Sequence, residues 1–302
     1  MTTTDTITTP VPDWQSPDGA ITLYRGDALA ILPHLPTGSV DALICDPPYS
    51  SGAWVRSERN QSPNAKYTQQ GTQHLHPEFV GDSRSQHGHG FWCALWLSQA
   101  HRIVRPGGIG LVFSDWRQLA VAMDAFEAGG WIHRATMTWD KGRGARVPHK
   151  AYPRHQGEFI LFGSHGPLKP ATHAGPFDGV IHCPVKPRRK LHITAKPVEL
   201  MEQLVRMTPP DAVVLDPFAG SGSTAIACIR TGRRFVGMEL DPVYFQVAVD
   251  RIREELAERD STANSVRDIP AQNGDTAGDG YQISATINTG DRPPVFSARP
   301  RN

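Results

Sequence analysis

The sequence predicts an α/β fold, a mostly parallel sheet with helices on both of its faces. Apolar, strand-like runs alternate with segments of helical periodicity along most of the chain, and this alternation is typical of parallel strands joined by helical crossovers. The runs VDALIC (40–45) and IGLVFS (109–114) are almost continuously apolar. Such runs are expected for strands that are buried on both faces of a sheet.

The individual elements follow from local composition and spacing. Compact β-type or alternating runs predict strands over 21–24, 40–45, 109–114, 131–139, 157–163, 212–216 and 233–240. Apolar residues at helical spacing predict helices over 91–104, 116–129, 197–207, 223–232 and 241–259. We expect Pro106-Gly107-Gly108 to end the first of these helices, because proline and glycine terminate helices.

Composition also suggests how the chain is divided. Its 302 residues suit one large domain or two small ones. We expect a flexible arm over 1–18, one α/β domain over 19–258, and a polar, disordered tail over 259–302. Within the domain, the long polar insert 50–90 and the loop regions 141–156 and 164–192 are candidate DNA-recognition elements. Long inserts of this kind are often functional.

Several classes of protein are disfavoured. The chain has no apolar run long enough for a membrane-spanning helix and no basic-then-apolar start typical of a secretory signal. The four cysteines form no CxxC pair, so we expect buried thiols, no zinc or other metal site, and a reducing, cytoplasmic location. The net charge of +1 taken alone disfavours a nucleic-acid partner.

The segment VLDPFAGSGST (214–224) predicts a strand, a tight turn and a helix. Gly220 and Gly222 allow the backbone to approach a ligand, and the helix amino-terminus offers free N–H groups. Glu239 ends the following strand and suits ribose hydroxyls. Asp216 would repel a pyrophosphate but suits an ammonium group. S-adenosylmethionine therefore fits better than a nicotinamide dinucleotide, and a purely structural turn is the alternative.

A second chemically distinctive turn, ICDPPY (44–49), follows another expected buried strand. Its prolines fix the backbone, so that Asp46 and the Pro47 carbonyl can accept hydrogens from one amino group. Tyr49 can stack on a planar base. Methyl transfer to an exocyclic amine needs this set, because the amine lone pair is delocalised into the ring. The base must also leave the duplex. A proline-rich loop without chemistry is the alternative.

Together, DPPY and DPFAGSGST resemble the DNA amino-methyltransferase family, which modifies adenine N6 or cytosine N4. The resemblance extends over most of residues 20–256 and includes the blocks RGDAL, HRIVRPGGIGLVFSDW, TWDKG, HITAKPVELMEQLV and GRRFVGMELDPVYFQVAVDRI. The catalytic block precedes the cofactor block, as in the group called beta. This resemblance implies a Rossmann-like, S-adenosylmethionine-dependent methyltransferase fold with a circularly permuted motif order.

The resemblance also implies roles for individual residues. Those expected to hold and stack the target base are Asp46, Pro47, Pro48 and Tyr49. Those expected around the methionine part of the cofactor are Asp216, Pro217, Phe218, Ala219, Gly220, Ser221, Gly222, Ser223 and Thr224. Glu239 would bind the ribose, and Asp27 with the Ala28 amide would read the cofactor adenine. Thr194 and Lys196 would hold its carboxylate end, with a cap and first turn of the next helix as the alternative.

Two basic tracts are candidate DNA contacts, because clustered cations neutralise phosphates. Their residues are Lys141, Arg143, Arg146, Lys150 and Arg154 in the first tract, and Lys186, Arg188, Arg189 and Lys190 in the second. A solvated basic surface is the alternative. Both tracts flank the expected base and cofactor blocks along the chain, which favours contact with double-stranded DNA.

The expected function is therefore site-specific methylation of adenine N6 in double-stranded DNA, with base flipping. Asp46 favours adenine, because family members that modify cytosine N4 more often have serine there. The alternatives are a cytosine-N4 or RNA amino-methyltransferase, a catalytically silent DNA-binding protein and a nicotinamide oxidoreductase. A cognate restriction endonuclease is a candidate partner, and the enzyme is expected to act as a monomer or homodimer.

Overall fold

A computed structural model describes residues 10–50, 84–143, 150–151, 153–169, 175–185 and 196–267. The chain up to Asp260 forms one compact unit, and 261–302 form a second. Of the second unit, the structure describes only the end of the last helix.

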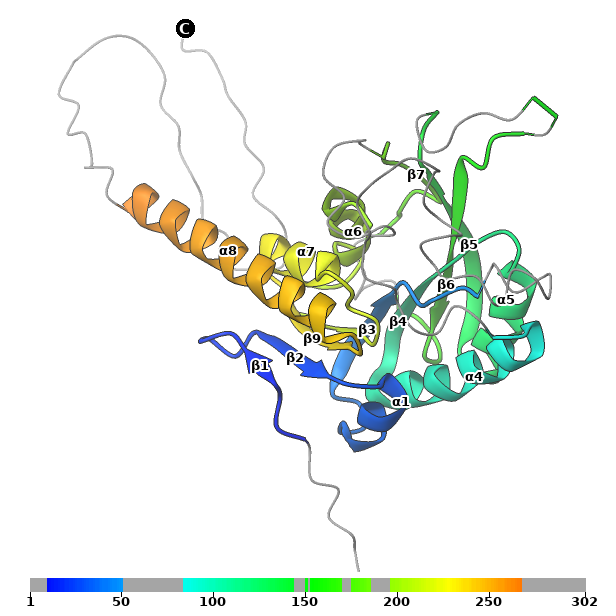
Figure 1. The fold of residues 1–302 in the computed structure, drawn as a ribbon, viewed down its shortest axis with the longest axis horizontal. Coiled ribbons are helices and arrows are strands. Elements are labelled where there is room, and N and C mark those ends of the chain that lie inside the picture. Colours follow the sequence, from blue (N-terminus) through cyan, green and yellow to red (C-terminus); the bar gives the residue numbers. More distant parts are fainter. Residues whose placement is uncertain are drawn as a thin grey trace, which may run out of the picture. The chain divides into compact units, whose positions relative to one another are not determined.

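A nine-stranded sheet forms the framework of the first unit, in the order β1-β2-β9-β8-β3-β4-β6-β5-β7 (Figure 1). Its strands are β1 Trp14–Gln15, β2 Ile21–Arg25, β3 Val40–Cys45, β4 Val104–Ser114, β5 Ile132–Asp140, β6 Gly157–Ser164, β7 Val180–His182, β8 Val213–Asp216 and β9 Arg234–Glu239. Strands β2, β9, β8, β3 and β4 are parallel neighbours. Strand β1 runs against β2, and β6 runs against both β4 and β5. The expected mostly parallel sheet is confirmed.

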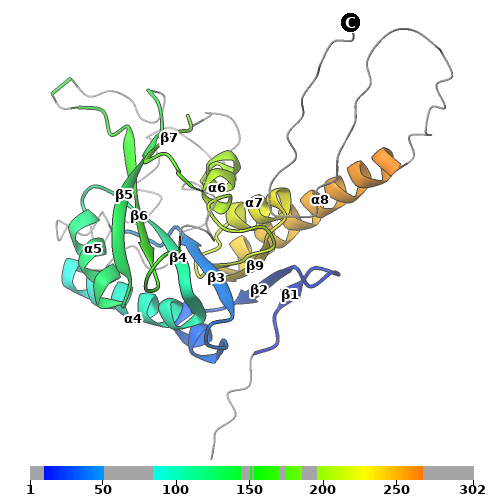
Figure 2. The same cartoon turned by 180° about the vertical axis from the view of Figure 1, so that it is seen from behind.

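Helices cover both faces of this sheet, as predicted (Figures 1 and 2). They are α1 Ala28–Ile31, the 3-10 turn η1 Leu32–His34, α4 Gln86–Ile103, α5 Leu119–Ala128, α6 Val198–Val205, α7 Ser223–Thr231 and α8 Pro242–Arg267. Successive residues of β3 enter different cores. Leu43 packs in the core that contains Trp96 of α4, whereas Ile44 packs in the core that contains Leu204 of α6. This alternation explains why the strand is apolar apart from Asp41.

The four cysteines are buried free thiols, as the sequence predicts. None of the helices in the described ranges combines the length and apolar character needed to cross a bilayer.

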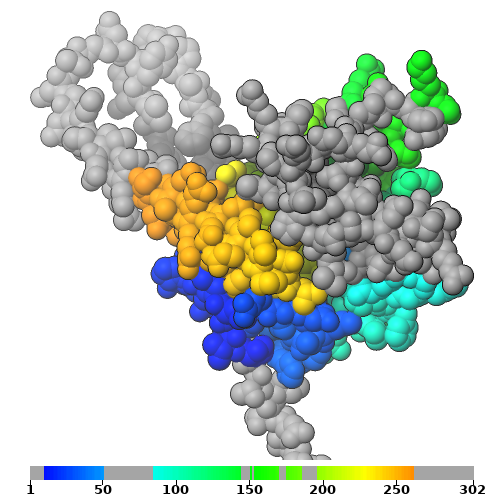
Figure 3. Space-filling model, viewed as in Figure 1, coloured from blue at the N-terminus to red at the C-terminus, as the bar shows by residue number. Residues whose placement is uncertain are grey.

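The ends of the domain differ from the expected boundaries. Trp14 pairs with Leu23 across β1 and β2, so part of the expected flexible arm belongs to the sheet. Helix α8 continues to Arg267, beyond the expected start of the tail. Arg259 of α8 lies 3.5 Å from Asp18, and Figure 3 shows the surface of α8 beside the N-terminal strands. The remainder of the arm, 1–9, and of the tail, 268–302, lies outside the described residues.

Pro106-Gly107-Gly108 do not end the preceding helix. Helix α4 already ends at Ile103, and these three residues belong to β4. The register between β3 and β4 shifts here, from Val40 opposite Val104 to Ala42 opposite Ile109. A Cβ on Gly108 would lie 2.5 Å from the Asp41 carbonyl oxygen, so the close approach of these strands requires glycine.

Two expected loop regions contain regular structure. Helix α4 begins at Gln86, inside the expected insert 50–90, and most of that insert lies outside the described residues. Strand β7 lies within the expected loop 164–192 and pairs with β5. Its three residues are too few to show a period in the sequence.

We predict that Gly163→Ala destabilises the fold. A Cβ at this position of β6 would overlap the fully buried Phe126 ring and lie 2.8 Å from the Ile132 carbonyl oxygen. Overpacking of this kind costs about 1–3 kcal/mol in the free energy of unfolding. The control is Gly179→Ala, because its Cβ would meet nothing within 4 Å. Urea unfolding followed by circular dichroism compares the two, and equal losses would contradict the prediction.

Candidate active site

Acidic side chains gather where the parallel strands end. Asp27 follows β2, Glu239 ends β9, Asp216 ends β8 and Asp46 follows β3. These four strands are consecutive neighbours in the sheet and run in one direction. The structure therefore brings the two predicted turns to adjacent positions on one edge, which is where ligands bind in open α/β sheets.

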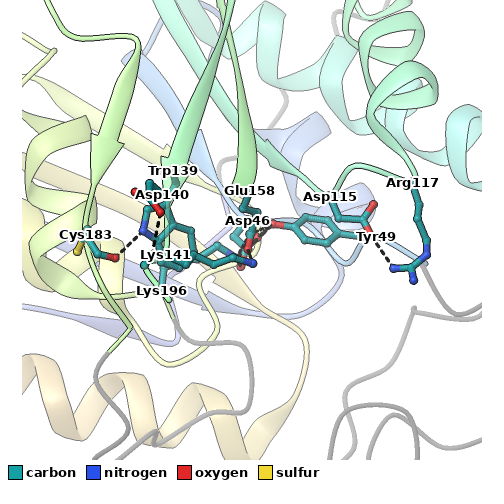
Figure 4. Close-up of polar contacts among 11 residues, drawn as sticks. Asp46, Tyr49, Asp115, Arg117, Trp139, Asp140, Lys141, Glu158, Cys183 and Lys196 are labelled. Carbon is teal, nitrogen blue, oxygen red and sulfur yellow. Dashed lines mark hydrogen bonds and ion pairs between the residues drawn. The ribbon is translucent and has the colours of Figure 1, made fainter. Parts of the chain in front are cut away.

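Two carboxylates converge on the turn that follows β3 (Figure 4). The Lys196 ammonium lies 2.5 Å from Asp46 Oδ2 and 2.8 Å from Glu158 Oε1. The Tyr49 hydroxyl contacts Asp46 Oδ1 and lies 2.7 Å from Glu158 Oε1. Sequence reasoning missed Glu158, although a carboxylate within the apolar run GEFILFG (157–163) was a visible signal.

The Lys196 side chain is only 7% exposed, and aromatic rings complete its surroundings. Its ammonium lies 4.9 Å from the centre of the Phe113 ring and 5.4 Å from that of Tyr49. Burial alone would lower the pKa of Lys196, but the charges of Asp46 and Glu158 outweigh burial and raise it. The side chain therefore stays cationic inside the site.

The two carboxylates respond differently to their surroundings. Burial raises the pKa of Asp46, and the nearby charge of Glu158 adds to this effect while Lys196 opposes it. Burial also acts to raise the pKa of Glu158, but Lys196 and Lys141 outweigh it and lower that pKa to about 2. Burial and both carboxylates raise the pKa of Tyr49 well above its ordinary value. Glu158 is thus the firmly ionised carboxylate, and Tyr49 is a neutral donor.

Two lysines have contacts other than those expected. Lys196, expected at the carboxylate end of a cofactor, bonds Asp46 and Glu158. Lys141, expected on DNA, lies 3.3 Å from Glu158 Oε2. Buried carboxylates need cations nearby, and this requirement draws both ammonium groups inward. Arg143, Lys150 and Arg154 are exposed, as a DNA contact requires. The expected site residues outside the described ranges are Arg146, Lys186, Arg188, Arg189, Lys190 and Thr194.

Asp216 and Glu239 brace the glycine-rich turn from within. Asp216 is 2% exposed, and its carboxylate accepts the Phe218 amide at 3.0 Å and the Thr224 hydroxyl at 2.5 Å. Burial raises the pKa of Asp216 to about 7. Glu239 accepts the Gly220 amide at 2.8 Å. Each carboxylate oxygen retains a lone pair that a ligand can use.

Helix α8 fixes the same turn from outside. Gly222 has a φ of 82°, and a Cβ there would lie 3.2 Å from the Ala248 Cβ of α8, so this position favours glycine. Arg251 of α8 donates to the Ser221 carbonyl. Gly220 also has a positive φ, but a Cβ there would meet nothing closer than 4.0 Å. Helix α7 begins at Ser223 without a side-chain cap, so its first amides are available to a ligand.

Aromatic rings of α4 pack against this turn. Phe218 packs against Trp92 and Trp96 of α4, with ring centres 5.4 and 5.0 Å away. Sequence reasoning did not assign either tryptophan, although their spacing of four residues places them on one face of a helix. Asp27 accepts the Leu29 amide at 3.0 Å and thereby caps α1, and the adjacent Ala28 is buried in the core that contains Trp96. In the described ranges, no group of three or more metal-ligating side chains occurs.

The arrangement suits transfer to an amino group. Asp46 uses one oxygen for Tyr49 and the other for Lys196, yet each oxygen can accept a second hydrogen bond. The Tyr49 side chain is partly buried and lies beside both carboxylates. An amino group brought to Asp46 would thus meet an acceptor in a partly buried environment, where hydrogen bonds are stronger than in bulk water.

A sequence profile of the DNA methylase family matches residues 40–174 and 176–250. The chain is 29% identical to the type II methyltransferase M.XycI of Xanthomonas campestris pv. cyanopsidis, over 77% of this chain and 87% of that one. It is 28% identical to the type II methyltransferase M.Cfr9I of Citrobacter freundii, over 78% of this chain and 88% of that one.

Solved structures share the fold. The PvuII DNA methyltransferase, described as cytosine-N4-specific, has a TM-score of 0.59 at 15% identity and covers 81% of this chain and 93% of its own. The complex of M1.HpyAVI with S-adenosylmethionine has a TM-score of 0.56 at 24% identity, covering 77% of this chain and 98% of that one. These similarities extend over nearly the whole of the two solved chains and over about four fifths of this one, and they identify the fold.

We predict that the charge of Asp216 makes stability depend on pH. Its pKa rises from 3.8 in the unfolded chain to about 7 in the fold. The stability it contributes is therefore present below pH 3.8 and lost as the pH rises through about 7. Asp216→Asn removes this titration. Between pH 5 and 7 the free energy of unfolding of the variant should therefore rise by about 2 kcal/mol relative to that of the wild type. Urea unfolding measures the difference, and a constant difference across this range would contradict the prediction.

Proposed function

The chain belongs to the DNA methylase family, and we propose that it transfers a methyl group from S-adenosylmethionine to the N6 amino group of adenine in double-stranded DNA. This family uses S-adenosylmethionine as its methyl donor. The observation that carries the proposal is the adjacency of the two turns, since Asp216 ends β8 and Asp46 follows the neighbouring parallel strand β3. A base and a methyl donor bound at these turns would meet at one edge of the sheet.

The glycine-rich turn is the proposed cofactor site. Asp216 would accept the ammonium group of the methionine part, and Glu239 would accept the ribose hydroxyls. Phe218 lies among the tryptophans of α4, and Asp27 stands beside Glu239 because Gly26 bonds the Glu239 carbonyl at 2.9 Å. The bound cofactor supplies an electrophilic methyl group on a sulfonium. The turn after β3 must present the amine to this methyl group.

The turn after β3 is the proposed base site. The Tyr49 ring would stack on the flipped base, which offsets part of the cost of unstacking. Asp46 and the Pro47 carbonyl would accept hydrogen bonds from the two amino hydrogens. These bonds would turn the nitrogen lone pair towards the methyl group. After transfer, the methylated nitrogen loses a proton to solvent. Lys196 and Glu158 touch Asp46 or Tyr49 rather than the reacting atoms in this arrangement, and they would act by positioning those two groups.

An aspartate at position 46 supports adenine as the target. Cytosine N4 is the second candidate, because the chain shares its fold with the cytosine-N4-specific PvuII enzyme. The restriction endonuclease partner and the oligomeric state stay predictions.

The experiment that tests the proposal follows the methyl group. Unmethylated bacterial DNA is incubated with S-adenosylmethionine carrying a tritiated methyl group and is then digested to nucleosides. We expect the label on N6-methyldeoxyadenosine. Label on cytosine would contradict the adenine assignment, and no label despite cofactor binding would indicate a silent DNA-binding protein. The matched control is Asp46→Ala, which should lower transfer by at least about a hundredfold while cofactor affinity persists. Loss of cofactor affinity would instead assign Asp46 to the cofactor site.

We further predict that Glu158→Gln changes the pH dependence of transfer. The charge of Glu158 raises the pKa of Asp46, so its removal should lower that pKa and move the acid limb of kcat to lower pH. Transfer should also fall by about tenfold, because Asp46 is then the only carboxylate that pairs with the Lys196 ammonium in this cluster. The pH profile of transfer under saturating cofactor and saturating DNA measures both effects. An acid limb that stays in place, or moves to higher pH, would exclude this positioning role.

A further inference from the structure

An exposed tryptophan lies next to the proposed base site. Trp116 is 51% exposed and belongs to the connection between β4 and α5. Tryptophan has a large apolar surface and is commonly covered unless it serves an interaction. Neither the proposed base site nor the proposed cofactor site uses this side chain.

Cationic and aromatic groups from two parts of the chain surround Trp116. The Arg117 guanidinium lies over the indole, 4.7 Å from its centre. The His155 ring is parallel to the indole within 3°, with its centre 5.8 Å away. Antiparallel pairing of β4 with β6 sets Ser114 opposite Phe159 and so brings the two segments together. We call Trp116, Arg117 and His155 the indole platform.

The platform is tied to the base site through two connections. The Gln118 side-chain Nε2 donates to the Ser50 carbonyl at 3.4 Å, and Ser50 directly follows Tyr49. Gln118 is itself 1% exposed, and its side-chain oxygen has no hydrogen-bond partner among the described residues. On the other segment, His155 lies three residues before Glu158, and the Glu158 carboxylate accepts a hydrogen bond from the Tyr49 hydroxyl. Figure 4 shows Arg117 on the side of Tyr49 that faces away from Lys196.

The Arg117 guanidinium is loosely paired and partly exposed. Its guanidinium lies 3.8 Å from Asp115 Oδ2, and its side chain is 36% exposed. Asp115 also accepts the backbone N–H of Gln118 at 2.9 Å, which fixes the turn that contains Trp116 and Arg117. The neighbouring Arg154 is exposed as well. A partner with stacking rings and negative charge fits these groups.

We propose that the indole platform binds DNA immediately beside the base being methylated. The indole stacks on a nucleobase next to the flipped one, and Arg117 pairs with a phosphate. Indole rings stack on any base, and guanidinium groups neutralise phosphates and release counterions. This inference rests on the proposed function and adds a defined contact surface to it.

The first test replaces the indole. Trp116→Ala should raise the KM for unmethylated bacterial DNA about tenfold or more, while Trp116→Phe should keep most of the wild-type value. The control is Ile132→Ala, because Ile132 is also exposed, at 42%, and begins β5 at the end of the sheet away from Glu158. Affinity for S-adenosylmethionine and the unfolding midpoint should match the wild type in every variant. A KM within twofold of wild type in Trp116→Ala would overturn the proposal.

The second test removes the charge. Binding of a fluorescein-labelled DNA duplex is measured by anisotropy at several salt concentrations. In Arg117→Ala the slope of log Kd against log salt should fall by about one. It should not change in Arg253→Ala, whose arginine is 59% exposed on α8. Equal slopes in wild type and Arg117→Ala would overturn the phosphate contact. If the wild type itself neither binds nor methylates DNA, it is the proposed function that fails.

Discussion

The ammonium of Lys196 between Asp46 and Glu158 is the interaction on which the site depends. The two carboxylates share the Tyr49 hydroxyl and would repel each other without a cation. Removing one partner from such a buried group leaves an uncompensated charge, which costs about 3–5 kcal/mol. The three charged residues come from the end of β3, the start of β6 and the segment before α6. One ion pair network therefore joins three distant parts of the chain and gives the catalytic turn its shape.

The direction of the strands determines which residues can meet. Parallel strands deliver Asp46, Asp216 and Glu239 to one edge because each follows or ends its strand there. Strand β6 runs in the opposite direction, so its beginning lies at this edge and Glu158 is the second residue of the strand. A mixed sheet thus adds to the edge a carboxylate that parallel strands alone would place at the far end.

Much of the fold and part of the site could be predicted from the sequence. Continuous apolar runs marked β3 and β4, and the glycines of the turn after β8 marked a ligand-binding backbone. Strand β1 was missed because two residues show no period. The partner of Lys196 was also missed, since Glu158 is separated from it along the chain and only the β4–β6 pairing brings it near Asp46. Local patterns reveal turns and buried strands, whereas contacts between charges depend on the tertiary arrangement.

Helix α4 passes into β4 without any connecting residues, as Ile103 ends one and Val104 begins the other. The tryptophans that pack on Phe218 lie upstream of this junction, and Trp116 lies just downstream of β4. An insertion or deletion near the junction would rotate the upstream side chains around the helix axis or flip the strand residues to the opposite face. Evolution can therefore vary this stretch in composition but hardly in length, so recombination between related enzymes should place its crossover points elsewhere.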